Sequence, residues 1–163
     1  MSELVLRNRQ RVRAVDLPWL RRIALALLAD DLLQAEFQLG VHLIEAREMM
    51  RLNEEFLHHA GSTDVITFDY ADHRSCLPPP AAAVHGEIFI CVDEAVAQAR
   101  RFQTSWQSEI VRYLVHGALH LRGHDDQSPT DRRSMKREEN RLLRRLAHRF
   151  ALSRLARRRK VAA

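Results

Sequence analysis

The sequence has little cysteine and no long apolar stretch. Its two cysteines, Cys76 and Cys91, lie fifteen positions apart and form no Cys-x-x-Cys motif. This spacing gives neither a disulfide framework nor a zinc-finger pattern. The longest apolar run near the N-terminus, residues 23–29, is closed by Asp30 and Asp31, whereas a membrane-spanning helix needs roughly 18 or more apolar residues. The sequence therefore predicts no membrane span and no membrane partner.

Acidic residues are absent from the C-terminal stretch. Residues 141–163 carry nine basic side chains and a net charge of +9, while residues 1–140 have a net charge of −4. A basic segment of this kind can bind a polyanion, contact an anionic membrane surface or remain solvated. At the other end, arginines occupy the positions where a signal peptide has its apolar segment. We therefore expect a cytoplasmic protein.

Strand-like and helix-like segments are mixed along the chain. Alternating or β-branched patterns predict strands at residues 4–13, 37–46, 63–70 and 86–92, and apolar residues at helical spacing predict helices at 16–33, 47–59, 93–102, 104–121 and from about 131. The length fits one domain. The prediction is an α+β fold in which a small mixed β-sheet of about four strands packs with about five helices. Residues 1–150 would form this domain and residues 151–163 a basic tail.

Local signals mark helix starts and one loop. Asp16 is a plausible N-cap, and Thr104 with Gln107 has the spacing of a capping box at the start of helix 104–121. Residues 71–85 contain three consecutive prolines, which cannot join a β-ladder. This segment is predicted to be an exposed loop.

The helix at 104–121 carries two histidines on one side. Its apolar residues form a continuous stripe: Ile110, Val111, Leu114, Val115, Ala118 and Leu119. His116 and His120 are four positions apart, so they project together, nearly opposite the centre of that stripe. Two histidines on one line away from the core face indicate a metal site more than a pair of structural side chains.

Gly123 follows this helix closely enough to end it in the left-handed conformation and turn the chain back. The turn would bring His124 and Asp126 near the histidine pair, and either could be a third ligand. We favour Asp126, because His-x-x-x-His-x-x-Gly-x-x-Asp is the metzincin spacing with aspartate in the last place. Three protein ligands leave a fourth position open, as in catalytic zinc sites.

Two other site chemistries use similar residues. Metalloproteases of the His-Glu-x-x-His type carry a glutamate after the first histidine, and this chain has Gly117 there, so proteolysis is disfavoured. Two histidines and a carboxylate can also hold Fe(II), so a non-haem iron protein remains an alternative.

With these residues the sequence resembles the YbeY family of bacterial rRNA maturation factors. "HGALHLRGHDD", residues 116–126, is similar to that family's His-Gly-x-Leu-His-Leu-x-Gly-Tyr-Asp-His signature. "LNEEFLHHAGSTDVITF" at 52–68 is similar to its segment ending Thr-Asp-Val-Leu-Ser-Phe, and "GEIFICVDEAVAQA" at 86–99 resembles its Gly-Asp-Ile strand and following helix. Members of the family are metal-dependent endoribonucleases.

The resemblance implies roles for individual residues. His116 and His120 would act in catalysis through one bound Zn²⁺ per chain, with Asp126 where the family usually has its third histidine. Leu57 stands where an arginine that handles the RNA phosphate is usual. His58, His59 or Arg51 could substitute for it, and His59 falls where many members have a basic residue. Further expected contacts to the substrate come from these residues: Arg51, Asn53, Thr63, Arg157, Arg158 and Arg159.

The resemblance also implies a function. The expected activity is a zinc-dependent, single-strand-specific endoribonuclease, a hydrolase of phosphodiester bonds acting in 16S rRNA 3′-end maturation, ribosome biogenesis and ribosome quality control. The expected partners are single-stranded RNA or rRNA and the ribosomal small subunit with its proteins. The alternative, favoured by Leu57, is a ribosome-associated assembly factor whose metal is structural and which has little catalysis of its own.

Overall fold

A four-stranded mixed sheet organises the fold. The computed structural model describes residues 2–58, 61–71 and 83–158. The strands are β1 (Glu3–Arg9), β2 (Phe37–Ile44), β3 (Val65–Asp69) and β4 (Val84–Cys91), and they lie in the order β1-β2-β4-β3. β1 pairs parallel with β2 and β2 with β4, while β3 runs antiparallel to β4. The predicted α+β fold with four strands and five helices is confirmed for this part of the chain.

The helices occur in the predicted order, with shifted ends. They are α1 (Leu17–Ala26), which continues as a π-helical turn (Leu27–Asp31), α2 (Ala46–Leu57), α3 (Val92–Phe102), α4 (Trp106–Leu121) and α5 (Pro129–Arg149). A 3₁₀ turn (Leu152–Leu155) follows α5. No helix among the described residues is long and apolar enough to cross a membrane. Most of the predicted proline loop, residues 72–82, lies outside the described residues.

Helix starts follow the capping chemistry of the sequence, with one correction. Asp16 caps α1 as predicted, because its side chain accepts a hydrogen bond from the backbone N–H of Trp19 at 2.9 Å. The predicted capping box of Thr104 is wrong, because Ser105 is the N-cap of α4 and accepts from the N–H of Ser108 at 3.1 Å. The Thr104 hydroxyl donates instead to the Glu109 carboxylate at 2.8 Å.

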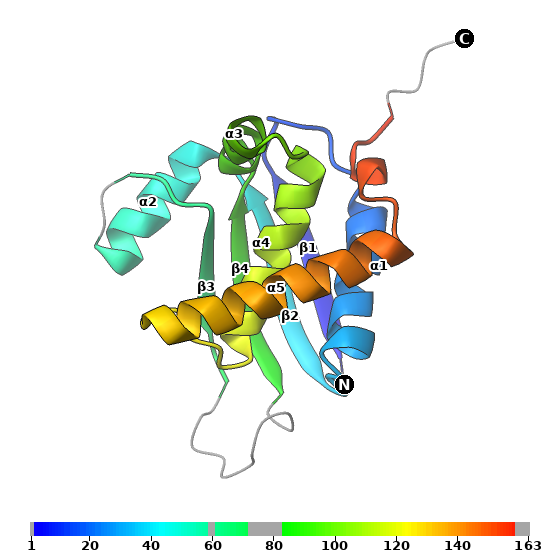
Figure 1. The fold of residues 1–163 in the computed structure, drawn as a ribbon. Coiled ribbons are helices and arrows are strands. Elements are labelled where there is room, and N and C mark those ends of the chain that lie inside the picture. The colour runs from blue at the N-terminus through cyan, green and yellow to red at the C-terminus, as the bar shows by residue number, and fades with distance from the viewer. Residues whose placement is uncertain (1, 59–60, 72–82, 159–163) are drawn as a thin grey trace.

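The main core lies between the sheet and α4, with α1 and α5 on the same side (Figure 1). Leu114, Val115, Ala118 and Leu119 of α4 are almost fully buried, which confirms the apolar stripe as the core face. Gly117 sets how closely α4 approaches β4: a Cβ built there would lie 2.8 Å from Cγ2 of Ile88. The helix that carries the histidines is therefore seated directly on the sheet.

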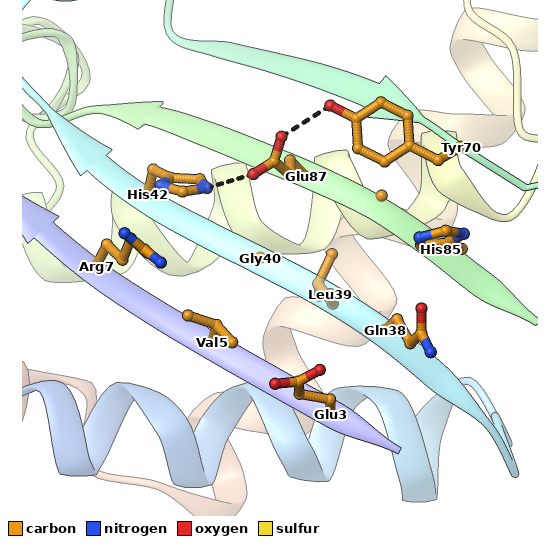
Figure 2. A pocket seen from close by; sticks show the side chains of 11 residues that line it. Glu3, Val5, Arg7, Gln38, Leu39, Gly40, His42, Tyr70, His85 and Glu87 are labelled. Carbon is orange, nitrogen blue, oxygen red and sulfur yellow. Dashed lines mark hydrogen bonds and ion pairs between the residues drawn. The ribbon is translucent and has the colours of Figure 1, made fainter. Parts of the chain in front are cut away.

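The opposite sheet face is polar at one end. Figure 2 shows that His42 of β2, Glu87 of β4 and Tyr70 after β3 meet there. With Gly40 they line a hollow of about 550 Å³. The Glu87 carboxylate lies 2.9 Å from Nε2 of His42 and accepts from the Tyr70 hydroxyl at 2.8 Å. At the other end of this face α2 buries Met49 in a second apolar cluster.

The start of the C-terminal tail packs against the domain. Leu155 in the 3₁₀ turn is fully buried, and its carbonyl accepts from the N–H of Asp16 at 2.8 Å. Ala156 forms a β-bridge with Val15, and the N–H of Arg157 donates to the carbonyl of Ala14 at 2.9 Å. Arg157 is thus held beside the N-terminal end of α1.

Candidate metal centre

Two histidines and an aspartate gather at the C-terminal end of α4. Nε2 of His116 lies 3.1 Å from Nε2 of His120, and Nε2 of His120 lies 3.6 Å from Oδ2 of Asp126. One ligand atom from each of these three residues lies within 4.8 Å of the other two. Within the described part of the chain, His116, His120 and Asp126 are the residues grouped closely enough to share one metal ion. The turn that returns the chain contains Gly123 with φ of +92°, the left-handed conformation anticipated for it.

The hydrogen bonds of the two imidazoles determine their protonation. Nδ1 of His120 lies 3.1 Å from the carbonyl oxygen of His124, which can only accept, so Nδ1 carries the proton. Nδ1 of His116 lies 2.9 Å from Oε2 of Glu139, a carboxylate, so it also donates. Each neutral ring therefore presents the lone pair of Nε2. Two lone pairs facing each other at 3.1 Å repel unless a cation lies between them.

Glu139 on α5 supports this arrangement from behind. Burial alone would raise its pKa, but hydrogen bonds from His116 and Arg112 outweigh burial and lower the pKa to about 2. Nη1 of Arg112 donates to Oε1 of Glu139 at 2.9 Å and to Oδ1 of Asn140 at 2.9 Å. Glu139 therefore stays ionised and holds the His116 ring in one orientation, as carboxylates behind metal-binding histidines do.

Burial and the neighbouring His116 also lower the pKa of His120, although Asp126 opposes the shift. The lowered pKa favours the neutral imidazole, which is the form that binds a metal.

The donor set fits a divalent metal such as zinc, since its three ligand atoms lie within 4.8 Å of one another. Tetrahedral Zn²⁺ with ligands about 2.0–2.2 Å away separates its donors by roughly 3.3–3.6 Å. The separations of 3.1 Å between the two nitrogens and 3.6 Å from His120 to Asp126 are close to this range. Two imidazoles and one carboxylate can hold a divalent metal with a fourth position left open.

The cluster opens into a pocket of about 970 Å³ between α4, α3 and the first turns of α5. His116, Asp126 and Glu139 line it together with Asp64, which precedes β3. Tyr113, one turn before His116 on α4, also lines the pocket, and burial raises its pKa strongly. Its hydroxyl is buried without a hydrogen-bond partner among the described residues.

The structure separates the two predicted third ligands. Asp126 lies in the cluster, whereas His124 contributes only its backbone carbonyl, to the ring of His120. Gly117, where a metalloprotease glutamate would stand, faces Ile88 of the sheet and not the pocket. A side chain at position 117 would therefore meet the core before it reached a substrate.

The described residues predicted to bind RNA are neither among the ligands of the cluster nor among the residues that line its pocket. Arg51 is exposed on α2, with its guanidinium 3.8 Å from Glu48. Asn53 is buried and donates from Nδ2 to the carbonyl of Gly61 at 2.9 Å, while the Thr63 hydroxyl donates to Asp64 at 3.2 Å. Asn53 and Thr63 thus hold the segment that positions Asp64 at the pocket.

Leu57, at the end of α2, leaves 45% of its surface exposed and does not line the pocket. Arg157 and Arg158 are exposed beyond the 3₁₀ turn and are not among the pocket residues. His59 and Arg159 lie outside the described residues.

Sequence reasoning did not single out Glu139 and Arg112. Glu139 is one of 21 acidic residues, and its hydrogen bond to His116 joins positions 23 apart. One signal was available, because Glu139 interrupts an otherwise apolar stripe on α5: Met135, Leu142, Leu143 and Leu146. An acidic residue on a core-facing stripe points to a buried partner.

The fold and the cluster define an α+β protein with a candidate metal centre at the end of a central helix. The sequence pattern of the family described as "Endoribonuclease YbeY" matches residues 6–147. The chain therefore belongs to the YbeY family, as the resemblance implied.

Individual relatives agree with this assignment. The protein named "Endoribonuclease YbeY" from Chlorobium phaeovibrioides is 39% identical over 98 residues, which cover 60% of this chain and 61% of that relative. The protein of the same name from Chlorobium limicola is 39% identical over 114 residues, 67% of this chain and 73% of the relative. The solution structure of TM1509 from Thermotoga maritima has the same fold, with a TM-score of 0.65, 18% identity and coverage of 99% of this chain and 100% of the other.

Proposed function

We propose that the protein is a zinc-dependent endoribonuclease that hydrolyses phosphodiester bonds in single-stranded RNA. The observation that carries this proposal is the convergence of Nε2 of His116 and Nε2 of His120, 3.1 Å apart, with Oδ2 of Asp126 3.6 Å from Nε2 of His120. The family name "Endoribonuclease YbeY" supports RNA as the substrate.

The roles of the side chains follow from their contacts. His116, His120 and Asp126 would hold one Zn²⁺, which when bound supplies Lewis-acid polarisation of a phosphoryl oxygen. Glu139 holds the proton on Nδ1 of His116 and so keeps Nε2 available. Arg112 donates to Glu139 at 2.9 Å and so holds the carboxylate in place. The carbonyl of His124 accepts from Nδ1 of His120 in the same way that Glu139 accepts from Nδ1 of His116.

In the cell we expect this activity in 16S rRNA 3′-end maturation and ribosome quality control, in the cytoplasm and at the small ribosomal subunit. The basic residues Arg157, Arg158 and Arg159 of the tail would add sequence-independent phosphate contacts. Exchange of Arg157 and Arg158 for alanine tests the tail better than a truncation after Asn140, because a truncation removes the buried Leu142, Leu143, Leu146 and Leu155.

The test is cleavage of a single-stranded RNA that carries a ribosomal 3′ precursor end. Wild type and His120→Ala are purified in parallel, assayed with and without chelator, and analysed for metal content. We expect cleavage to be lost on mutation and on chelation. When Zn²⁺ is added back to both proteins, only the wild type should recover cleavage. Equal cleavage by both preparations would identify a contaminating nuclease and overturn the proposal.

A second candidate is a ribosome-associated assembly factor with a structural metal. Leu57 favours it, since an apolar side chain stands where the resemblance predicts a phosphate-handling arginine. The same assay separates the two functions. A zinc-loaded wild type that binds small subunits but shows no metal-dependent turnover would support the assembly factor.

A further inference from the structure

The pocket that contains the candidate metal ligands is lined by basic side chains from α5. Arg132, Arg133 and Lys136, in the first two turns of this helix, line the same pocket as His116 and Asp126. Residues 132, 133 and 136 lie on one side of the helix because positions three and four apart are neighbours. Nothing in the sequence pattern of the metal site requires cations at these positions.

Among the described residues, no carboxylate forms an ion pair with two of these three side chains. Arg132 donates to the backbone carbonyls of Asp126 at 3.3 Å and Gln127 at 3.1 Å, so it is held in place without an acidic partner. Arg133 is exposed and makes no ion pair with any described residue.

The third, Lys136, lies 3.3 Å from Glu139, but Glu139 already pairs with Arg112 and bonds to His116. Its side chain remains 60% exposed. Glu139 is thus shared among Lys136, Arg112 and His116. The lining of the whole pocket has four basic and four acidic side chains, and three of the basic ones lie together in the first two turns of α5, so positive charge is concentrated on that side of the pocket.

We propose that Arg132, Arg133 and Lys136 form a binding site for phosphodiester groups of single-stranded RNA, next to the phosphate that is held at the metal centre. This inference rests on the proposed function for the identity of the ligand. Lysine and arginine side chains bind the phosphates of an RNA backbone without regard to sequence, and they release counterions when they do so.

The site differs in position from Leu57 and from the basic tail. Leu57 is apolar and lies outside the pocket, whereas Arg132, Arg133 and Lys136 line the pocket itself. The described start of the basic tail, by contrast, lies at the far end of α5, away from the turn that precedes this helix (Figure 1). Besides Arg112 of α4, the basic side chains that line the pocket therefore come from the start of α5.

The experiment compares three variants with wild type: Arg133→Ala, Lys136→Ala and the double variant. Arg137→Ala is the matched control, because Arg137 is exposed on the same helix and outside the pocket, and its loss changes the net charge equally. Binding of a short fluorescein-labelled single-stranded RNA is followed by anisotropy over a series of salt concentrations. Each protein is measured zinc-loaded and with chelator, and cleavage is measured in parallel.

We expect the slope of log affinity against log salt concentration to fall by about 0.7 for each phosphate that is no longer bound, hence by about 1.4 in the double variant. Arg137→Ala should keep the wild-type slope. In the cleavage assay KM should rise with little change in kcat, since these interactions are made equally in the ground state and in the transition state. Unchanged melting temperatures would show that the exposed substitutions leave the fold intact.

Slopes of Arg133→Ala and Lys136→Ala that equal the slope of Arg137→Ala overturn the site. The proposed function fails separately. If wild type does not cleave RNA but the double variant has the reduced slope, the phosphate site stands and the nuclease does not. If wild type cleaves and the slopes are all equal, the nuclease stands and the phosphate site does not.

Discussion

Glu139 lies behind His116, with Oε2 of the carboxylate 2.9 Å from Nδ1 of the ring. The contact joins α5 to α4 and determines which nitrogen of His116 is free. A residue that never touches the metal would thereby set the geometry of the metal site.

Glu139→Gln is expected to weaken zinc binding by about 10–100-fold, because a neutral amide holds the imidazole less strongly and no longer fixes its tautomer. Competition with a chromophoric chelator measures the affinity. Glu138→Gln is the matched control, since Glu138 pairs with Arg141 at the helix surface. Equal zinc affinities of the two variants would contradict the role given to Glu139.

Asp126→Ala is expected to lower zinc affinity strongly, whereas His124→Ala should leave it within a few-fold of wild type. The reason is that Asp126 directs Oδ2 toward the histidines and His124 contributes only its main-chain carbonyl. The same competition titration measures both variants. A larger loss in His124→Ala would make His124 the third ligand instead.

Gly117→Ala is expected to destabilise the protein although alanine is the better helix former. The added methyl group would lie 2.8 Å from Ile88, and overpacking of this kind costs about 1–3 kcal/mol. The gain in helix propensity is about 1 kcal/mol at most. Urea unfolding of the two proteins gives the difference. Increased stability would show that Ile88 moves aside freely.

Glu87 is expected to contribute to stability in a pH-dependent way. Burial raises its pKa, but hydrogen bonds from Tyr70 and His42 outweigh burial and lower it below the ordinary value of 4.5. A carboxyl whose pKa is lowered by folding stabilises the folded state above its ordinary pKa, and this contribution is lost as the pH falls below that value. Because the side chain is about one-third exposed, we expect a contribution below about 1 kcal/mol.

The measurement is urea unfolding of wild type and Glu87→Gln at several pH values from neutral to acid. Wild type should be the more stable at neutral pH, and the difference should shrink as the pH falls through the acid range. Glu54→Gln, an exposed glutamate on α2, is the control and should show no such trend. A difference that stays constant with pH would contradict the assignment.

Local interactions account for what could be predicted. His116 and His120 could be paired from the sequence because they share one helix, and Asp126 because a short glycine turn brings it back to that helix. The N-cap of α1 was predicted for the same reason. The capping box at Thr104 failed, since Ser105 competes for the same role one residue later.

By itself, the sequence determined the strands and helices, the mixed composition of the fold and the pair of histidines, because these depend on periodicity and on contacts within a few residues. The tertiary structure alone decided that Glu139 and Arg112 stand behind His116 and that Arg133 and Lys136 line the pocket of the candidate metal centre. It also decided that Arg157 lies beside the start of α1, outside that pocket. These relationships depend on how α5 crosses α4. That crossing is set by the packing of buried side chains over the whole core, which no local pattern encodes.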